Sequence, residues 1–192
     1  PSFLSIRNFK NIITQSSVRA IIALGVAGLI VTQGTDLSAG RQVGLAAVIS
    51  ATLLQASTNV NKVLDIGELP VIVAILVVTV VGMIIGSING LIVAKLNVHP
   101  FIATLGMMTI VYGMNSLYYD SVGKASPISG FSKAYSNFAQ GTIGSGSFSI
   151  SYLIIYAAIA TAIMWVLWNK TKFGKNVFAV GGNPEAAKVS GV

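Results

Sequence analysis

Charged side chains are scarce in this chain of 192 residues: they make up 9% of it, whereas soluble domains carry roughly 25%. Five acidic and twelve basic residues are too few to cover a soluble particle whose mean hydropathy is +0.79. The composition therefore predicts a protein whose solvent is partly lipid. The net charge of +7 does not indicate nucleic-acid binding, because the basic residues are scattered between apolar runs.

Cysteine is absent and histidine occurs once, as His99. These absences exclude disulfides, thiolate metal sites, cysteine nucleophiles and metal centres built from several histidines. A membrane enzyme would need a base beside a nucleophile or a pair of acids, but His99 lies in a turn and three aspartates fall in separate loops, at Asp36, Asp65 and Asp120. We therefore expect neither a metal nor a cofactor bound by this chain.

Long apolar segments are what the sequence does contain. There are five, at residues 12–33, 43–56, 70–94, 100–119 and 150–168. A helix needs about 20 apolar residues to cross the hydrocarbon of a membrane, so four of them are long enough and segment 43–56 is too short to cross alone. We predict an all-α, polytopic membrane helix bundle with about five spans, one of them broken at Gly34–Gly40, forming part of one transmembrane domain over residues 1–192.

The orientation of the bundle follows from its basic residues, because short loops rich in Lys and Arg stay in the cytoplasm. Three lysines follow the last apolar segment directly, at Lys170, Lys172 and Lys175. This pattern predicts a cytoplasmic segment at about 169–192 and, by alternation, an outer loop at about 120–149. Residues 34–42 are then cytoplasmic, and the start of the chain lies outside.

The polar interruption after the first apolar segment contains Gly34, Asp36, Ser38 and Arg41. Glycine permits backbone angles that break a helix, and irregular backbone at membrane depth persists only where protein or a watery cavity satisfies its polar groups. Asp36 would then cap the next helix or line a substrate pathway. The alternative is an ordinary cytoplasmic turn in which Asp36 and Ser38 act only as caps.

A stripe of small residues runs along segment 70–94, at Gly82, Gly86 and Gly90. Glycine at every fourth position forms a groove into which another helix can pack, and Asn89 beside the stripe can hydrogen-bond across such a contact. Packing without substrate contact is the simpler interpretation. The expectation is therefore a helix-packing face, with Asn89 also a candidate for the substrate pathway.

Two polar side chains on the next span, Thr104 and Asn115, permit the same two interpretations. Polar groups in lipid usually bond a neighbouring helix and less often line a pathway.

An ion-coupled secondary transporter would need ionisable groups at the membrane midplane, where only Asp36 could serve. Such a transporter stays an alternative, as does a membrane enzyme.

The predicted cytoplasmic segment ends in a pattern typical of a short capped helix. It reads Gly181-Gly182-Asn183-Pro184-Glu185-Ala186-Ala187 and finishes at Gly191-Val192. Asn183 is suited to the N-cap, Pro184 to the first helical position, and Glu185 to the positive end of the helix dipole, while Gly191 ends the helix. The segment is either a surface loop or a helix that docks on a soluble partner, because so short a helix is not stable alone.

Four stretches in this order resemble the permease subunits of ribose- and galactose-type sugar ABC importers. They are Gly34-Thr35-Asp36-Leu37-Ser38-Ala39-Gly40, then Gly82 to Gly90, then Pro100-Phe101-Ile102-Ala103-Thr104-Leu105-Gly106-Met107, and finally Gly181 to Ala187. The resemblance covers residues 11–192. Gln33-Gly34-Thr35 stands where the family usually has two glycines and an isoleucine, a departure expected of its galactoside branch.

The resemblance implies a multi-pass protein of the bacterial inner membrane that forms a homodimer around a sugar path. It implies cytoplasmic ABC ATPase subunits, which would bind ATP and Mg²⁺, and a periplasmic sugar-binding protein as partners. The chain has no Gly-x-x-x-x-Gly-Lys-Ser/Thr phosphate loop, so ATP would be hydrolysed on a partner. The segment 183–191 is similar to the family's coupling helix, and further helices are expected on both sides of the chain.

Overall fold

The computed structural model describes residues 3–123, 127–144 and 149–192. These residues are mostly helical, and four of their helices are long and apolar enough to cross a membrane. The chain divides into two compact units, which we call unit 1 (residues 1–35 with 139–192) and unit 2 (residues 36–138). The predicted class, a polytopic helical membrane protein, is confirmed.

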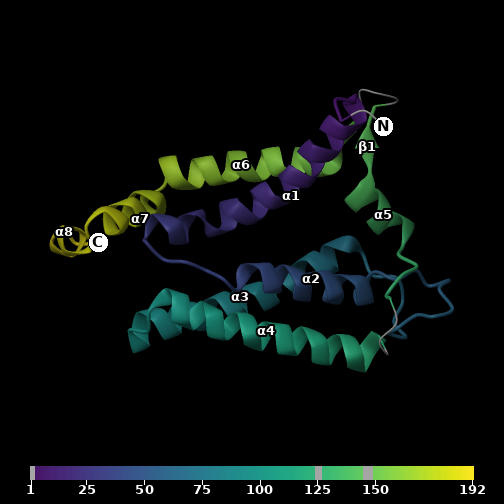
Figure 1. Ribbon diagram of the computed structural model, residues 1–192, viewed down its shortest axis with the longest axis horizontal. Helices are drawn as coiled ribbons and strands as arrows, with labels where there is room; N and C mark the ends of the chain where they lie inside the picture. Colours follow the sequence, from purple (N-terminus) through teal and green to yellow (C-terminus); the bar gives the residue numbers. More distant parts are fainter. Residues whose placement is uncertain (1–2, 124–126, 145–148) are drawn as a thin grey trace. The chain divides into compact units, whose positions relative to one another are not determined.

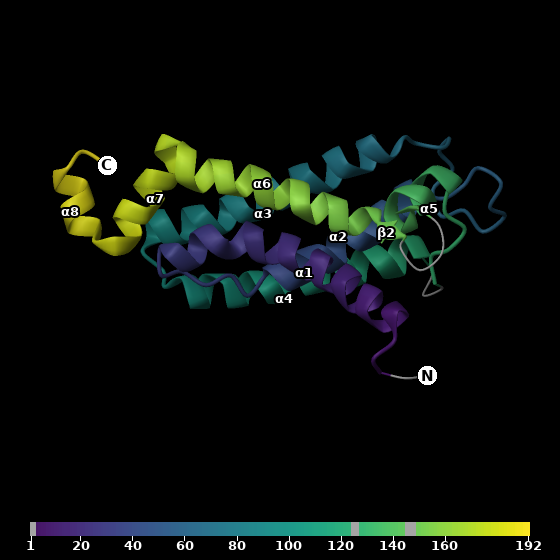
Figure 2. The same cartoon turned by 90° about the horizontal axis from the view of Figure 1, so that it is seen from above.

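Unit 1 is built on two long helices that lie side by side and run in the same direction (Figures 1 and 2). They are α1 (Ile6–Val31) and α6 (Tyr152–Lys170). At one end Lys10 donates to Ser149 Oγ, and at the other Gln33 Nε2 donates to the carbonyl of Gly181 at 3.3 Å. The strands β1 (Thr142–Ile143) and β2 (Ile150–Ser151) pair before α6, and α7 (Lys172–Gly182) and α8 (Pro184–Val189) follow it.

Unit 2 holds three further helices, in which the short α2 (Ala39–Leu53) packs against both α3 (Val71–Leu96) and α4 (Pro100–Gly123). Its apolar core is small and consists of Leu45, Ile85, Met107 and Val111, with Ile49 and Val81 beside them. The helix α5 (Lys133–Gln140) leads from unit 2 back to unit 1.

Most apolar side chains of the long helices point away from protein. The most apolar window of α3 has a mean hydropathy of 2.9, yet only 11% of it is buried. Ile72, Leu76 and Met83 are each more than half exposed. Because water would oppose such exposure by about 25 cal/mol per Å² of apolar surface, these faces need lipid or another protein surface around them.

The structure differs from the expected architecture in three places. The short second segment becomes α2, whose 15 residues extend about 22 Å, so it does not qualify as a span by length. The first span begins at Ile6, six residues before the predicted start. The predicted outer loop at 120–149 contains the end of α4, the helix α5 and a two-stranded sheet, so the fold is not strictly all-α; its residues 124–126 and 145–148 lie outside the described ones.

An aromatic cluster joins the ends of three helices in unit 1. Trp168 of α6 lies 6.0 Å from the Phe173 ring and 6.1 Å from the Phe178 ring, both in α7. A Cβ added at Gly28 of α1 would lie 2.6 Å from the Trp168 ring, so only glycine lets α1 approach the indole. We call Trp168, Phe173, Phe178 and Gly28 the aromatic joint.

Gly181 allows an even closer approach between α7 and α1. A Cβ at this position would overlap the backbone carbonyl oxygen of Val31, the last residue of α1. The same addition at the neighbouring Gly182 would meet no atom within 4 Å. The end of α7 is thereby held against the end of α1 by a contact between two backbones.

These two adjacent glycines provide a matched test of that contact. We expect Gly181→Ala to destabilise the purified full-length protein by roughly 1–3 kcal/mol, because the overlap with a backbone atom forces the helices apart. Gly182→Ala should be neutral or stabilising by up to about 1 kcal/mol, since alanine favours a helix over glycine. Thermal unfolding in detergent measures both, and equal melting temperatures for the two variants would contradict the contact.

Candidate functional site

The break that follows α1 is built from a left-handed residue and a capping glycine. Gln33 has a φ of 61°, and the Gly34 amide donates to the carbonyl of Leu29 at 2.8 Å, which ends α1. Gly34 therefore belongs to the end of a unit 1 helix. Asp36, Ser38 and α2 belong to unit 2.

The hydroxyl of Ser38 is the centre of a buried polar network in unit 2. Its Oγ donates to Asp36 Oδ1 at 2.6 Å and accepts from Gln42 Nε2 at 2.9 Å and from Asn89 Nδ2 at 3.1 Å. A serine hydroxyl has one donor and two acceptor sites, so all three are used. We call Asp36, Ser38, Gln42 and Asn89 the polar network.

The Ser38 amide at the break is satisfied by a nearby side chain. Asp36 Oδ1 also accepts from the Ser38 amide at 2.8 Å, two residues on. Ser38 is the N-cap residue of α2 by position, but its side chain makes no capping bond. The expectation that Asp36 caps the amides that open α2 is therefore wrong: its carboxylate orients Ser38 instead.

The polar network lies well away from the end of α3. Asn89 precedes the last residue of α3, Leu96, by seven positions, which is about 10 Å along the helix. A helix of 26 residues is about 39 Å long, so in a core of about 30 Å a centred α3 would place Asn89 about 6 Å inside the hydrocarbon. Of the two interpretations of the break, this depth favours irregular backbone within the membrane over an ordinary cytoplasmic turn.

Two buried amide oxygens in unit 2 have no hydrogen-bond partner among the described residues. They are Asn89 Oδ1 and Asn115 Oδ1. Asn89 is only 6% exposed, and Asn115 lies beside Gly44 of α2, where a Cβ would be 4.0 Å from Asn115 Nδ2. A buried carbonyl without a donor costs about 1–3 kcal/mol, so these oxygens are suited to a donor from outside the chain.

Of the residues that the sequence singled out for a pathway, the structure brings Asp36, Ser38 and Asn89 into direct contact. Thr104 is buried, but its hydroxyl donates to the carbonyl of Pro100 on its own helix at 2.8 Å. Gln42 was missed, although its position four residues after Ser38 on a predicted helix was a signal.

A second omission is Arg19, which lies midway along α1 and is exposed. It is the one charged residue inside the first predicted apolar segment, which alone marks it as a functional candidate. A guanidinium at that depth cannot face lipid at low cost, so this side of α1 requires a protein or aqueous neighbour.

The opposite end of α2 is anchored by buried polar side chains. Thr52 Oγ1 and the Tyr118 hydroxyl are 2.9 Å apart, and Thr52 is fully buried. Gln55, 1% exposed, donates to the Ser129 carbonyl and accepts from the Val63 amide. Hydrogen bonds at both ends thus hold the short α2 between its longer neighbours.

The glycine stripe of α3 faces open space. A Cβ at Gly82, Gly86 or Gly90 would meet no atom within 4 Å. The face that packs on unit 2 is the adjacent one, which carries Ile85 and Asn89. That the stripe packs against another helix stays a prediction, and within the described residues no helix fills it.

The capped helix near the end of the chain forms as the sequence indicated. Asn183 Oδ1 accepts from the Ala186 amide at 3.1 Å, Pro184 begins α8, and Glu185 lies in the first turn. Gly191 has a φ of 82°, as expected of a residue that ends a helix. Ala187 is buried, and α8 packs on α7. The sequence did not predict α7, whose last residue is Gly182.

The polar network offers neutral hydrogen-bond donors and acceptors together with one carboxylate. Among the described residues no group of three or more His, Cys, Asp or Glu side chains could hold a metal ion. Arg41 is the nearest cation along the chain, and its guanidinium lies 4.6 Å from the centre of the Tyr112 ring.

Comparison with known proteins adds the family. A family model described as "Branched-chain amino acid transport system / permease component" matches residues 8–192. The chain belongs to this family. It is 68% identical to the galactose/methyl galactoside import permease protein MglC of Escherichia coli K12 and 66% identical to that of Haemophilus influenzae, in each case over the whole of this chain and 57% of the relative.

More distant relatives include the ribose import permease protein RbsC of Bacillus subtilis, 34% identical over the whole of this chain and 54% of the relative. The chain thus spans little more than half the length of these curated relatives. No solved structure matches it. These relatives confirm the resemblance to sugar import permeases that the four motifs suggested.

Removal of the Ser38 hydroxyl tests the polar network. We expect Ser38→Ala to destabilise the full-length permease by roughly 1–2 kcal/mol, because it deprives Asp36, Gln42 and Asn89 of a common buried partner. Ser87→Ala, an exposed position on α3, should change stability by less than about 0.5 kcal/mol. Thermal unfolding compares the two, and a Ser38→Ala variant as stable as Ser87→Ala would contradict the network.

Proposed function

We propose that this chain is part of the permease subunit of an ATP-driven importer of galactose-class sugars, including methyl galactosides, in the bacterial inner membrane. The observation that carries the proposal is the buried polar network of unit 2, with its unpartnered amide oxygens at membrane depth. Asp36, Ser38, Asn89 and Asn115 line the sugar path, and Gly34, which ends α1, lets the chain enter the break. Thr104 supports the helix beside it.

The chemistry of the network favours a sugar over an amino acid. An amino acid carries a carboxylate and an ammonium group, so a site for it needs charges of both signs. The network has one ionisable member, Asp36, and otherwise hydroxyl and amide groups. Sugar hydroxyls donate and accept, and can therefore supply the donors that Asn89 Oδ1 and Asn115 Oδ1 lack.

The relatives support the galactose class among sugars. Identity to two galactose/methyl galactoside permeases is 66–68%, against 34% to a ribose permease.

The energy source lies on a partner in this proposal. The chain has no phosphate-binding loop, and its capped α8 presents Glu185 and Lys188 on a short helix that follows α7, which carries Lys172 and Lys175. We assign residues 182–187 and Gly191 to docking on a cytoplasmic ABC ATPase, where ATP and Mg²⁺ are bound. A periplasmic sugar-binding protein delivers the substrate from the other side.

Unit 1 supplies a stiff connection from α8 to the membrane. α8 packs on α7 through Ala187, α7 meets α1 at Gly181, and the aromatic joint ties α7 to α6. Displacement of α8 by the ATPase therefore moves α1 and α6 rather than bending a loop. α1 leads directly into the break that precedes the polar network.

A second copy of the permease completes the path in this proposal. The open stripe at Gly82, Gly86 and Gly90 offers a surface for a close helix contact, either with that copy or with a part of the permease beyond this chain. An ion-coupled transporter has less support, because the Asp36 carboxylate is already engaged by Ser38.

Reversal of the charge on α8 tests the coupling role. Glu185→Lys changes the charge of the docking surface by two units and removes about 0.3–1 kcal/mol of helix-dipole stabilisation, and Gly191→Val strains a residue with positive φ. In the reconstituted importer we expect the double variant to lose both sugar transport and the ATPase stimulation caused by sugar-loaded binding protein, while membrane insertion stays normal.

Asp65→Lys is the matched control, since it makes the same charge change in an exposed loop of unit 2. It should retain stimulation. Full stimulation of ATP hydrolysis in the Glu185→Lys/Gly191→Val importer would rule out α8 as the coupling element.

A further inference from the structure

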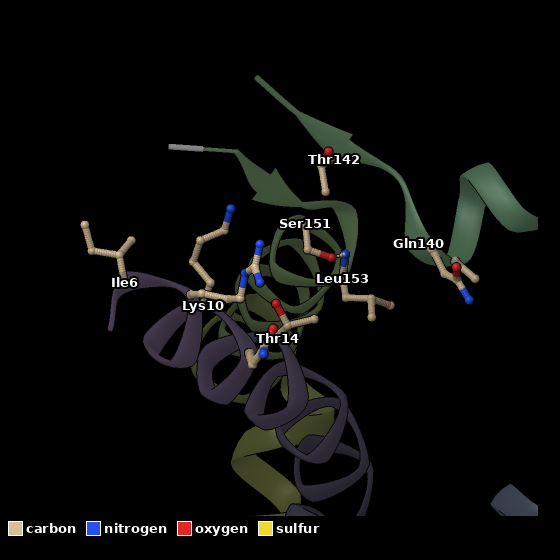
Figure 3. A pocket seen from close by; sticks show the side chains of 10 residues that line it. Ile6, Lys10, Thr14, Gln140, Thr142, Ser151 and Leu153 are labelled. Atoms are coloured by element: carbon tan, nitrogen blue, oxygen red, sulfur yellow. Dashed lines mark hydrogen bonds between the residues drawn. The ribbon is translucent and has the colours of Figure 1, made fainter. Parts of the chain in front are cut away.

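A cavity of about 730 Å³ opens at the end of unit 1 where α1 and α6 begin. Its walls come from the first turns of α1, the end of α5, both short strands and the first turn of α6; Figure 3 shows Lys10 and Thr14 of α1 on one side and Thr142 and Ser151 of the strands on the other. Nothing in the proposed transport function uses it. Its size is within the range of ligand sites, roughly 300–1,000 Å³.

The described residues that line this cavity include two cations and no acid. They are Arg7 and Lys10, accompanied by the neutral polar side chains of Asn11, Thr14, Gln140, Thr142 and Ser151. The only acidic residue in the sequence of unit 1 is Glu185, in α8 at the far end of the α1–α6 pair (Figure 2). Unit 1 therefore cannot neutralise these two charges itself.

The local structure adds positive potential and fixes one of the cations. Two helices begin at the cavity, α1 after Ser5 and α6 after Ser151, and each helix start carries about half a positive charge. The Lys10 ammonium donates to Ser149 Oγ at 2.5 Å, which holds it beside the strands. The cavity is thus suited to an anion.

The surroundings place that anion at the membrane surface. α1 is 26 residues long, about 39 Å, so its first turns extend beyond a hydrocarbon core of about 30 Å into the headgroup layer. Ile6 lines the cavity and is 61% exposed, and Phe9, Ile143 and Ile150 near it are each about half exposed. Cations among neutral polar side chains, with exposed apolar side chains alongside, match a phosphate with acyl chains attached.

We propose that this cavity binds the phosphodiester headgroup of an anionic phospholipid, such as phosphatidylglycerol. The phosphate lies between Arg7 and Lys10, the polar side chains receive the glycerol hydroxyls, and the acyl chains follow the exposed apolar side of α1. Both lipids carry a phosphate, but only phosphatidylglycerol has a net negative charge. Because basic residues near a membrane attract anionic lipid, we expect the site to select phosphatidylglycerol over zwitterionic phosphatidylethanolamine.

The test uses the purified full-length permease in detergent, titrated with phosphatidylglycerol or phosphatidylethanolamine and measured by native mass spectrometry. We expect selective retention of phosphatidylglycerol, and a loss of affinity of roughly fivefold for each of Arg7→Gln and Lys10→Gln. Lys133→Gln is the control, a basic and exposed residue of the outer loop that does not line the cavity. The charge-preserving Lys10→Arg should bind as the parent does.

Three results would overturn the proposal. Equal retention of the two lipids, or equal losses in the cavity variants and in Lys133→Gln, would remove the lipid site. Displacement of phosphatidylglycerol by inorganic phosphate at comparable concentration would show a free-anion site. Unchanged lipid binding with weakened docking of the periplasmic binding protein would assign the cations to that protein. Since lipid retention is measured without ATP or sugar, its result tests the lipid site independently of the transport proposal.

Discussion

The structure depends on one constraint, that hydrocarbon offers polar groups no hydrogen-bond partner. A chain that breaks a helix within a membrane must satisfy the polar groups of the break from within the protein. Here the Ser38 hydroxyl makes three hydrogen bonds to three different side chains, and Asp36 Oδ1 accepts from the Ser38 amide. One of these partners, Asn89, is on α3, so the same hydroxyl that orders the break also ties α2 to its neighbour. Thr52 and Tyr118 complete the attachment of α2 at its other end.

In unit 1 the helices are held together where glycines allow close approach to the helix backbone. Gly28 lets the Trp168 ring of α6 lie against α1, and Gly181 lets α7 contact the last carbonyl of α1 directly. The backbone contact at Gly181 transmits displacement better than flexible side chains would, because backbone atoms cannot change rotamer. A short docking helix attached to this joint is thereby connected to two membrane helices. The proposed coupling relies on this stiffness, as the proposed path relies on the polar network.

The parts of this structure that were predictable from sequence are those with local or compositional causes. Lipid-facing helices need apolar residues on all sides, so hydropathy located the spans, and the cap of α8 depends on neighbours within three residues of Asn183. Contacts between distant segments carried no such signal. The Ser38–Asn89 hydrogen bond and the contact of Gly28 with Trp168 join residues far apart in the chain. The assignment of Asp36 as a cap failed because its carboxylate bonds Ser38.

The central claim is that the unpartnered amide oxygens of unit 2, Asn89 Oδ1 and Asn115 Oδ1, serve the sugar, and Asn115→Leu in the full-length permease separates this role from a structural one. Asn115 Oδ1 has no partner among the described residues, so an apolar side chain of similar size should leave the melting temperature unchanged or raise it. Galactose transport by the reconstituted importer should nevertheless fall roughly fivefold or more, the effect of one lost hydrogen bond to the substrate. Unaltered transport by a stable Asn115→Leu permease would contradict the account.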